Sequence, residues 1–198
     1  MPFIVIEGPD YSGKTTTIER LKPFLKNAVY LREPGSSPLT EKVREGMQAS
    51  PMDDSARQLI MHGCRLDMLD KHGWFFDPDT LYVLDRYLPS TYCYAKVDHI
   101  NPDVIRGLVK LFPVPTPVFT FVLTPPLNVI LSRALDRGRI DALEGSLDRI
   151  AGVHKNYLEL GRYFPGNVSY VPWTDMSMVL YDILAEIRWN KGLTKFVT

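Results

Sequence analysis

Eight residues near the N-terminus have the types and the spacing of a phosphate-binding loop. Residues 8–15 read GPDYSGKT and match the pattern G-x-x-x-x-G-K-[ST]. In such a loop the backbone N–H groups form a concave anion site, and the positive end of the next helix faces it. Lys14 would then hold the outer phosphates, and the Thr15 hydroxyl would bind Mg²⁺. The alternative is a glycine-rich turn that binds no ligand.

The elements around this loop favour the phosphate-binding interpretation. Residues 3–6 (FIVI) form a short apolar run, which predicts a buried parallel strand. Residues 16–26 predict a helix, because Ile18, Leu21 and Leu25 recur on one side of it. Strand, loop and helix is the order that the motif requires, so the context supports the match.

The rest of the chain alternates apolar strands with helical segments. Further strands are predicted at residues 28–31, 81–84, 118–123 and 168–171. Helices are predicted at residues 39–48, 53–71, 89–96, 102–112, 125–136, 146–164 and 175–189. This alternation predicts an α/β fold of one domain over residues 1–198, in which helices cover both faces of a five-stranded parallel sheet. Residues 190–198 are expected to form a loosely attached tail.

The composition indicates which class of ligand is disfavoured and which cellular compartment is expected. The chain has 198 residues and no net formal charge, which argues against a long nucleic-acid polymer as ligand. Cys64 and Cys93 fit no metal-binding spacing and indicate free thiols in a reducing compartment. No apolar run approaches the roughly 20 residues that span a bilayer. A strand begins almost at once, without a signal peptide, so we expect a cytoplasmic protein with no membrane contact.

Four charged residues are placed where they could contact a ligand. Arg32 follows the second predicted strand, and Asp85 and Arg86 follow the third, at the ligand-binding edge of a parallel sheet. There Asp85 could hold Mg²⁺ through water, and Arg86 could clamp a second phosphate. The alternatives are a solvated loop charge for Arg32 and a surface ion pair for the other two. Arg65, within a helical apolar pattern, either extends to water or points into a cleft, and we favour the cleft.

A cluster of arginines follows the predicted helix at residues 125–136. Arg133, Arg137 and Arg139 lie around Gly138, and the first two stand four residues apart on one helix face. This cluster predicts a short basic lid at about residues 137–145 that closes over phosphates. The alternative is an ordinary charged helix end, in which arginine complements the helix dipole.

Together these motifs resemble the thymidylate kinases, in their bacterial form. The resemblance covers nearly the whole chain: residues 3–8 with Asp10, residues 13–15, 32–35, 59–65 and 85–87, Ser90, Thr91, Tyr94, Arg137, Gly138, Asp141, Glu144 and residues 157–160. The combination D-R-Y-x-x-S-x-x-x-Y is far more specific than the phosphate loop alone. The resemblance implies a three-layer P-loop kinase fold. It also implies transfer of the γ-phosphoryl group of ATP, with Mg²⁺, to a deoxypyrimidine monophosphate, dTMP first of all.

The resemblance also implies roles for individual residues. Lys14, Arg86, Arg137 and Arg139 would be catalytic, because phosphoryl transfer depends on positioning and positive charge. The donor would contact Asp10, Tyr11, Ser12, Gly13, Lys14, Thr15, Thr16 and Arg133. The acceptor would contact Asp10, Arg32, Pro34, Met61, Arg65, Arg86, Ser90, Thr91, Tyr94 and Tyr157. Asp10 would approach the sugar 3′-hydroxyl, Arg65 the base, and the Tyr94 ring the 2′ carbon, while Thr15 and Asp85 would bind the metal ion.

The chain departs from the pattern of the family in four places. Tyr11 replaces the usual glycine of bacterial members, and Met61 replaces a phenylalanine that stacks on thymine. Ala142 replaces a lid arginine, and residues 172–173 (Pro-Trp) replace an Asp-Ala pair near the expected adenine. A virus-encoded or otherwise divergent member would show such departures, and its base preference would be the property to shift.

Two other functions compete with this interpretation. One is a kinase for a modified pyrimidine deoxynucleotide, such as 5-hydroxymethyl-dUMP, or for such a base in DNA. The neutral net charge disfavours the DNA form, because binding a polymer depends on many phosphate contacts. The other is a non-enzymatic nucleotide-binding switch, which the acceptor residues and the basic lid disfavour. The family commonly forms homodimers, so the resemblance implies a homodimer that binds small nucleotides.

Overall fold

The computed structural model describes residues 2–72, 77–138, 142 and 144–198. Its sheet has five strands, namely β1 (Phe3–Glu7), β2 (Ala28–Arg32), β3 (Leu81–Asp85), β4 (Phe119–Leu123) and β5 (Val168–Val171). They lie in the order β2-β3-β1-β4-β5, and every neighbouring pair is parallel. The predicted five-stranded parallel sheet is therefore confirmed. β1 is central, with β3 on one side and β4 on the other, which opens a crevice beyond its carboxyl end.

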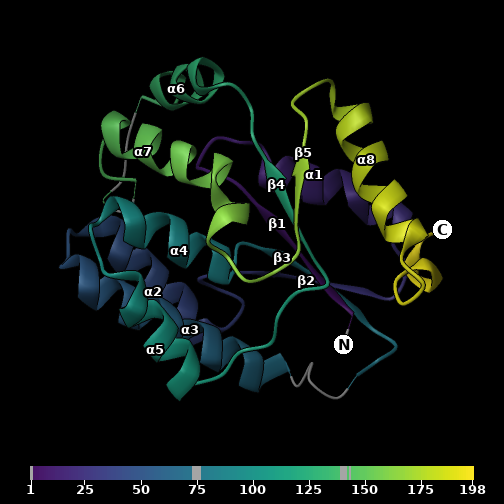
Figure 1. The fold of residues 1–198 in the computed structure, drawn as a ribbon, viewed down its shortest axis with the longest axis horizontal. Coiled ribbons are helices and arrows are strands. Elements are labelled where there is room, and N and C mark those ends of the chain that lie inside the picture. Colours follow the sequence, from purple (N-terminus) through teal and green to yellow (C-terminus); the bar gives the residue numbers. More distant parts are fainter. Residues whose placement is uncertain (1, 73–76, 139–141, 143) are drawn as a thin grey trace.

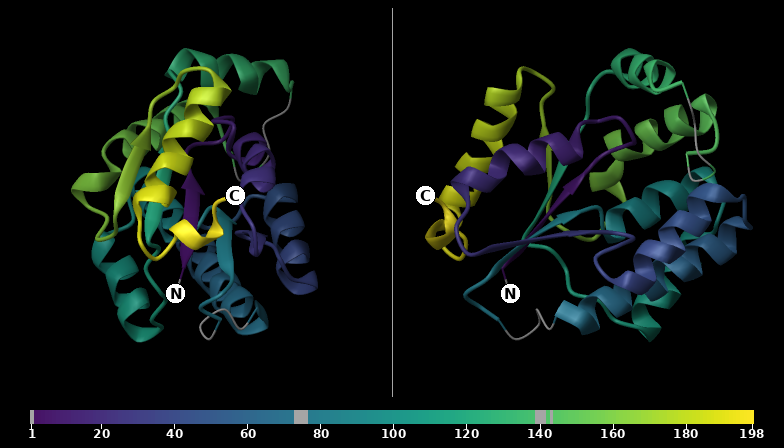
Figure 2. Two further views of the ribbon diagram at one scale, coloured as in Figure 1. Left: turned by 90° about the vertical axis from the view of Figure 1, so that its right-hand side faces the viewer. Right: turned by 180° about the vertical axis from the view of Figure 1, so that it is seen from behind.

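Helices cover both faces of this sheet (Figures 1 and 2). They are α1 (Lys14–Leu21), α2 (Pro38–Ala49), α3 (Asp54–His72), α4 (Leu88–Val97), α5 (Pro102–Leu111), α6 (Leu127–Asp136), α7 (Leu147–Leu158) and α8 (Met176–Trp189). Side chains alternate between the faces along β1. Ile4 and Ile6 pack in the core that includes Ile18 of α1 and Ile183 of α8. Phe3 and Val5 pack in the opposite core, which α3, α4 and α7 cover.

Two predicted helices end earlier than the apolar spacing suggests. The first stops at Leu21 and passes into a 3₁₀ turn, Lys22–Phe24, because Pro23 cannot donate a backbone hydrogen bond. The helix predicted at residues 146–164 stops at Leu158 and continues as a 3₁₀ turn, Leu160–Arg162. There the Gly161 N–H donates to the Tyr170 hydroxyl, at 2.9 Å, rather than to the preceding helical turn. The expected cap of α8 is confirmed, since Asp175 accepts hydrogen bonds from two backbone N–H groups of its first turn.

The prediction of a loose C-terminal tail is wrong. Leu193 and Phe196 are each only 1% exposed and pack in the core beneath α1 and α8. The Phe196 carbonyl accepts a hydrogen bond from Lys26 N–H at 2.9 Å, and Thr198 N–H donates to the Phe24 carbonyl at 3.0 Å. The physical reason is the three-residue spacing of Leu193 and Phe196, which puts two apolar side chains on the same side of a final short turn.

We expect Phe196→Ala to lower the free energy of unfolding by about 3–5 kcal/mol, the usual cost of truncating a buried phenylalanine. Phe24→Ala is the matched control, because it removes the same atoms from a side chain that is 41% exposed. Urea denaturation of both variants, compared at equal slope, measures the difference. Equal unfolding midpoints for the two variants would show that the tail adds no stability.

Candidate active site

The phosphate-binding loop follows β1 at the centre of the sheet. Gly8 has φ 146°, and a Cβ atom there would lie 2.6 Å from the Leu123 carbonyl oxygen, so only glycine fits. Gly13 has φ 93° and immediately precedes α1. Ser12 is buried, and its hydroxyl has no hydrogen-bond partner among the described residues. The loop therefore presents its backbone and the start of α1 to the space beyond β1, as the sequence pattern predicts.

A cavity of about 540 Å³ opens at this edge of the sheet. It brings together most of the side chains predicted for the donor and for the acceptor. Those on its wall are Asp10, Tyr11, Gly13, Lys14, Thr15, Thr16, Arg32, Pro34, Met61, Asp85, Arg86, Ser90, Thr91, Tyr94, Arg133 and Arg137. Of the predicted site residues, Ser12, Arg65 and Tyr157 do not line it, and Arg139 lies outside the described residues.

The Lys14 amine lies over the phosphate-binding loop. It donates to the carbonyl oxygens of Gly8 at 3.1 Å and Pro9 at 2.8 Å. Burial, together with the nearby charge of Arg86, lowers the pKa of Lys14 to about 8. A phosphate in the cavity would favour the protonated form of this amine, because an opposite charge within a few ångströms raises the pKa of a lysine.

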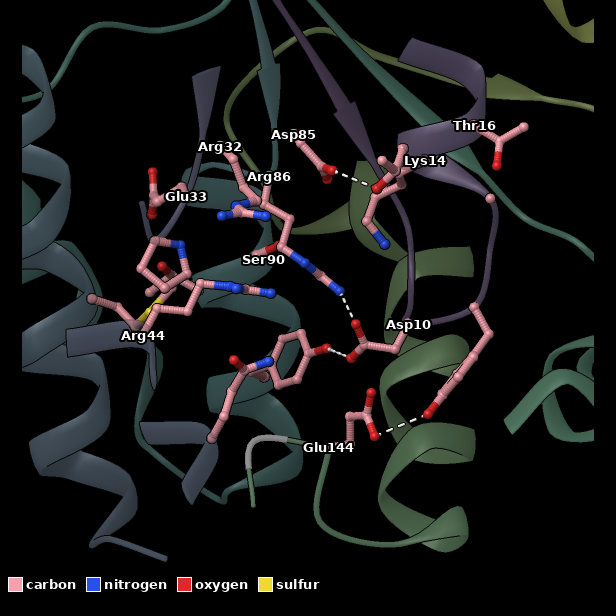
Figure 3. A pocket seen from close by; sticks show the side chains of 18 of the residues that line it. Asp10, Lys14, Thr16, Arg32, Glu33, Arg44, Asp85, Arg86, Ser90 and Glu144 are labelled. Atoms are coloured by element: carbon pink, nitrogen blue, oxygen red, sulfur yellow. Dashed lines mark hydrogen bonds and ion pairs between the residues drawn. The ribbon is translucent and has the colours of Figure 1, made fainter. Parts of the chain in front are cut away.

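Thr15 and Asp85 meet from two neighbouring elements. Asp85 ends β3, and Thr15 lies in the first turn of α1. The Thr15 hydroxyl donates to Asp85 Oδ2 at 3.0 Å, and both residues line the cavity (Figure 3). The described residues hold no group of three or more His, Cys, Asp or Glu side chains that could bind a metal ion. One carboxylate and one hydroxyl still suit Mg²⁺, which keeps several waters and takes further oxygens from substrate phosphates.

Arg86, Asp10 and Tyr94 form a connected group on the cavity wall. Arg86 ion-pairs with Asp10, and the Tyr94 hydroxyl donates to the other Asp10 oxygen at 2.5 Å (Figure 3). Burial alone would raise the pKa of Asp10, but the charges of Arg86 and Lys14 outweigh it and lower the pKa to about 2. Asp10 is therefore ionised at neutral pH, and it fixes both the guanidinium and the phenol ring beside the cavity.

Glu7 is a buried carboxylate that lies behind the Arg86–Asp10–Tyr94 group, away from the cavity. It accepts hydrogen bonds from Tyr87 N–H at 2.8 Å, from the Ser90 hydroxyl at 2.8 Å and from the Tyr157 hydroxyl at 2.7 Å. Burial raises the pKa of Glu7, although Arg86 and these donors oppose the shift. Tyr157 therefore binds Glu7 behind the cavity wall and does not line the cavity itself. Sequence reasoning missed Glu7, although a carboxylate that ends a wholly apolar strand was a signal for it.

Arg65 points neither to water nor into the cavity. It is fully buried and forms an ion pair with Glu33. The guanidinium also forms hydrogen bonds with His62 Nδ1 at 3.2 Å and the Thr91 hydroxyl at 2.9 Å, and it lies 5.0 Å from the centre of the Tyr87 ring. Contrary to expectation, Arg65 does not itself line the cavity, because Glu33 and Thr91, which do line it, hold the guanidinium behind the wall. A contact between Arg65 and a base stays a prediction, and Glu33 and Thr91 are its links to the cavity wall.

Arg133 and Arg137 contact Tyr11 of the phosphate-binding loop directly. Arg133 donates to the Tyr11 carbonyl oxygen at 2.8 Å, and its guanidinium lies 4.7 Å from the centre of the Trp173 ring. Arg137 donates to Glu144 at 2.6 Å. The predicted lid extends over residues 139–141 and 143, which lie outside the described residues. Contacts to the loop favour a role for these arginines at the cavity over an ordinary helix end.

Several cavity residues gave no signal in the sequence. They are Arg44, Gln48, Arg57, Gln58 and Met176. Arg44 and Gln48 stand four residues apart on one face of α2. In the sequence this face looks like a solvated helix side, but in the fold α2 packs beside α3 and the two side chains line the cavity. Figure 3 shows Arg32, Arg44 and Arg86 reaching the same space from three different elements. Arg32 also pairs with Glu41 at 2.7 Å on its exposed side.

None of the helices described is both long and apolar enough to cross a membrane.

Comparisons with known proteins agree with this geometry. A thymidylate kinase from Alkalilimnicola ehrlichii is 29% identical over 96% of this chain and 96% of its own length. A thymidylate kinase from a Wolbachia pipientis of Culex pipiens is 30% identical over 80% of each chain. The solved thymidylate kinase of Candida albicans has a TM-score of 0.76 at 21% identity, covering 96% of this chain and 92% of that one. That structure supports the fold. A sequence model of the thymidylate kinase family matches residues 6–181, and the chain belongs to this family.

Proposed function

We propose that this chain transfers the γ-phosphoryl group of ATP to dTMP, giving dTDP, and that Lys14, Arg86 and Arg137 hold the phosphates during transfer. One observation carries the proposal. These three cations come from a loop, a strand end and a helix end, yet all line one cavity. Phosphoryl transfer needs little covalent chemistry from the protein and depends on positioning and charge stabilisation. The attacking atom is an oxygen of the acceptor phosphate, which is already anionic, so no general base is required.

The donor occupies the side of the cavity beside α1. Its phosphates lie on the loop under Lys14, and Thr15 and Asp85 hold Mg²⁺, which supplies positive charge to the phosphate oxygens when bound. Support comes from the loop conformation and from the 3.0 Å contact between Thr15 and Asp85. The donor base lies near Arg133 and Trp173, a cation and an aromatic ring that offer flat surfaces for stacking.

The acceptor occupies the side of the cavity beside α3 and α4. Arg86 clamps its phosphate, Asp10 accepts a hydrogen bond from the sugar 3′-hydroxyl, and the base lies against Met61 and Pro34. The support for this orientation is the Arg86–Asp10–Tyr94 group on one wall and the two apolar side chains on another. A radiolabelled-ATP assay against dTMP, other nucleoside monophosphates and one oligonucleotide tests it. Labelling of the oligonucleotide alone, or of nothing, would overturn the proposal.

A methionine side chain, Met61, would contact the flat face of the acceptor base. Met61 lines the cavity. The aromatic ring of Tyr92, which follows Thr91 on α4, packs against Phe164 in the core and does not line the cavity. A thioether touches a ring favourably but does not enforce a flat slot. We therefore propose that the site also accepts substituted pyrimidines, such as 5-hydroxymethyl-dUMP. The neighbouring Gln58 and Thr91 offer polar groups to such a substituent.

We expect Met61→Phe to increase the selectivity for dTMP over 5-hydroxymethyl-dUMP by several-fold, because a rigid ring yields less than a flexible thioether to the larger 5-substituent. The measurement is kcat/KM for both nucleotides, for the natural chain and for the variant. Met68→Leu is the control, because Met68 is buried in the core and does not line the cavity. Strict dTMP selectivity in the natural chain, unchanged by Met61→Phe, would show that another residue sets the base preference.

We also propose that the chain forms a homodimer in the cytoplasm. Exposed apolar side chains on α3 and α5, including Leu59 and Leu111, support a partner of this kind. The two cysteines are buried free thiols, which suits a reducing compartment. Light scattering gives the mass in solution, and a mass of one chain at micromolar concentration would contradict the dimer.

A further inference from the structure

Tyr11 is held both at its backbone and at its hydroxyl. The partners are Arg133, in the last turn of α6, and Glu144, which follows that helix. The Tyr11 backbone is in the left-handed region, with φ 66°, in the middle of the phosphate-binding loop. Its carbonyl oxygen accepts from Arg133 at 2.8 Å, and its hydroxyl donates to Glu144 Oε2 at 2.9 Å. The Arg137 guanidinium lies 5.9 Å from the centre of the Tyr11 ring. The side chain therefore bridges the loop and the arginines that face it.

Glu144 is shared by a cation and a phenol. Arg137 Nη1 donates to Glu144 Oε1 at 2.6 Å, and the Tyr11 hydroxyl occupies the other carboxylate oxygen. The two partners differ in burial, since the Glu144 side chain is 7% exposed and the Arg137 side chain is 50% exposed. Glu144 is thus a nearly buried anion, and Arg137 is a cation that is half open to the cavity.

A phosphate group entering the cavity competes with Glu144 for Arg137. Both are anions, and guanidinium pairs with either in the same geometry. If Arg137 turns to the phosphate, the nearly buried carboxylate loses the charge of Arg137, which is costly unless other donors remain. The Tyr11 hydroxyl is such a donor. It contacts the oxygen of Glu144 that Arg137 Nη1 does not, and the hydrogen bond that it accepts from Arg137 Nη1 is long, at 3.4 Å. The hydroxyl can therefore stay on Glu144 during the exchange.

We propose that Tyr11 is a positioning residue for phosphoryl transfer, whose hydroxyl keeps Glu144 hydrogen-bonded while Arg137 turns from that carboxylate to the donor phosphates. The inference rests on the role proposed above for Arg137. It assigns Glu144 the complementary role of holding Arg137 beside the loop before the donor arrives. It also gives a physical reason for a tyrosine at this position, because a glycine has neither the hydroxyl that binds Glu144 nor the ring beside Arg137.

The test uses Tyr11→Phe, which keeps the ring under Arg137 and removes only the hydroxyl. We expect kcat to fall about tenfold, the lower end of what a hydrogen bond to a charged group contributes, with KM for dTMP unchanged. Tyr30→Phe is the matched control, because the Tyr30 hydroxyl is buried and has no hydrogen-bond partner among the described residues. Unfolding midpoints of both variants establish that each is folded.

Combining Tyr11→Phe with each of two other variants distinguishes a positioning role of Tyr11 from general support of the phosphate-binding loop. In Glu144→Gln the carboxylate charge is absent, so adding Tyr11→Phe should change kcat less than about twofold. In Arg137→Ala the exchanging cation is absent, so Tyr11→Phe should again have little effect. If Tyr11→Phe keeps the kcat of the natural chain while Arg137→Ala is impaired, the inference about Tyr11 is wrong and the role proposed for Arg137 stands. A full tenfold loss that persists in both combinations also overturns the inference about Tyr11. A natural kcat for Arg137→Ala overturns the proposed role of Arg137 itself.

Discussion

Lys14→Ala and Arg86→Ala should each lower kcat by about 10²-fold or more, the typical effect of removing one charge that stabilises a transferring phosphoryl group. The reason is that each cation is held in advance of the reaction. Lys14 is fixed by two carbonyl oxygens of the loop, and Arg86 by Asp10 and by the Ser90 hydroxyl at 3.2 Å. Neither needs to be reorganised when charge develops between the two nucleotides. Steady-state kinetics with ATP and dTMP measure the loss.

Surface cations provide the controls for these variants. Lys22 pairs with Glu19, and Arg106 with Asp103, on exposed helix faces, so their alanine variants should retain full activity. Arg86→Lys separates charge from shape, because a lysine keeps the charge but cannot bind phosphate through two parallel hydrogen bonds. We expect its kcat to fall between those of the natural chain and Arg86→Ala. Near-natural rates for Lys14→Ala or Arg86→Ala would contradict the assignment of that residue.

The sheet and the loop could be predicted because their signals are local. An apolar run followed by G-x-x-x-x-G-K-T and a helical pattern fixes a strand, an anion site and a helix within about 25 residues. Charges that follow the other strands then reach the same edge for topological reasons, as Arg32, Asp85 and Arg86 do. No knowledge of long-range contacts is needed for either step.

The depth of a polar side chain could not be predicted in the same way. Arg65 and Tyr157 look like cavity residues, but partners far along the chain hold them behind the cavity wall, Glu33 in one case and Glu7 in the other. The Tyr11 contact with Glu144 spans 133 positions. Spacing along a helix or strand shows which face a residue occupies, whereas the partner on that face is set by packing.

Tyr94 is the residue most strongly fixed against the expected sugar position. Its hydroxyl is bonded to Asp10 at 2.5 Å, and the guanidinium groups of Arg86 and Arg149 lie 5.7 Å and 5.3 Å from its ring centre. Arg149 is itself held by Asp98 through two hydrogen bonds, at 2.5 Å and 3.1 Å. A ring held in this way cannot give way to an additional atom. We therefore expect the site to reject ribonucleotides by steric exclusion, which acts against the wrong substrate rather than for the right one.

The natural chain should have a kcat/KM for dUMP about 10²-fold above that for UMP, the scale on which a closely fitted pocket rejects one added hydroxyl. Tyr94→Ala should bring the two values within about tenfold of each other, because it removes the ring that blocks the 2′ position. Tyr94→Phe keeps the ring and loses only the bond to Asp10, so its overall rate should fall while the ratio of the two substrates is retained. Comparable efficiencies on UMP and dUMP in the natural chain would rule out steric exclusion. A ratio lost equally in Tyr94→Phe and Tyr94→Ala would instead place the discrimination in the hydrogen bond to Asp10, and the ring would then serve only to carry that hydroxyl.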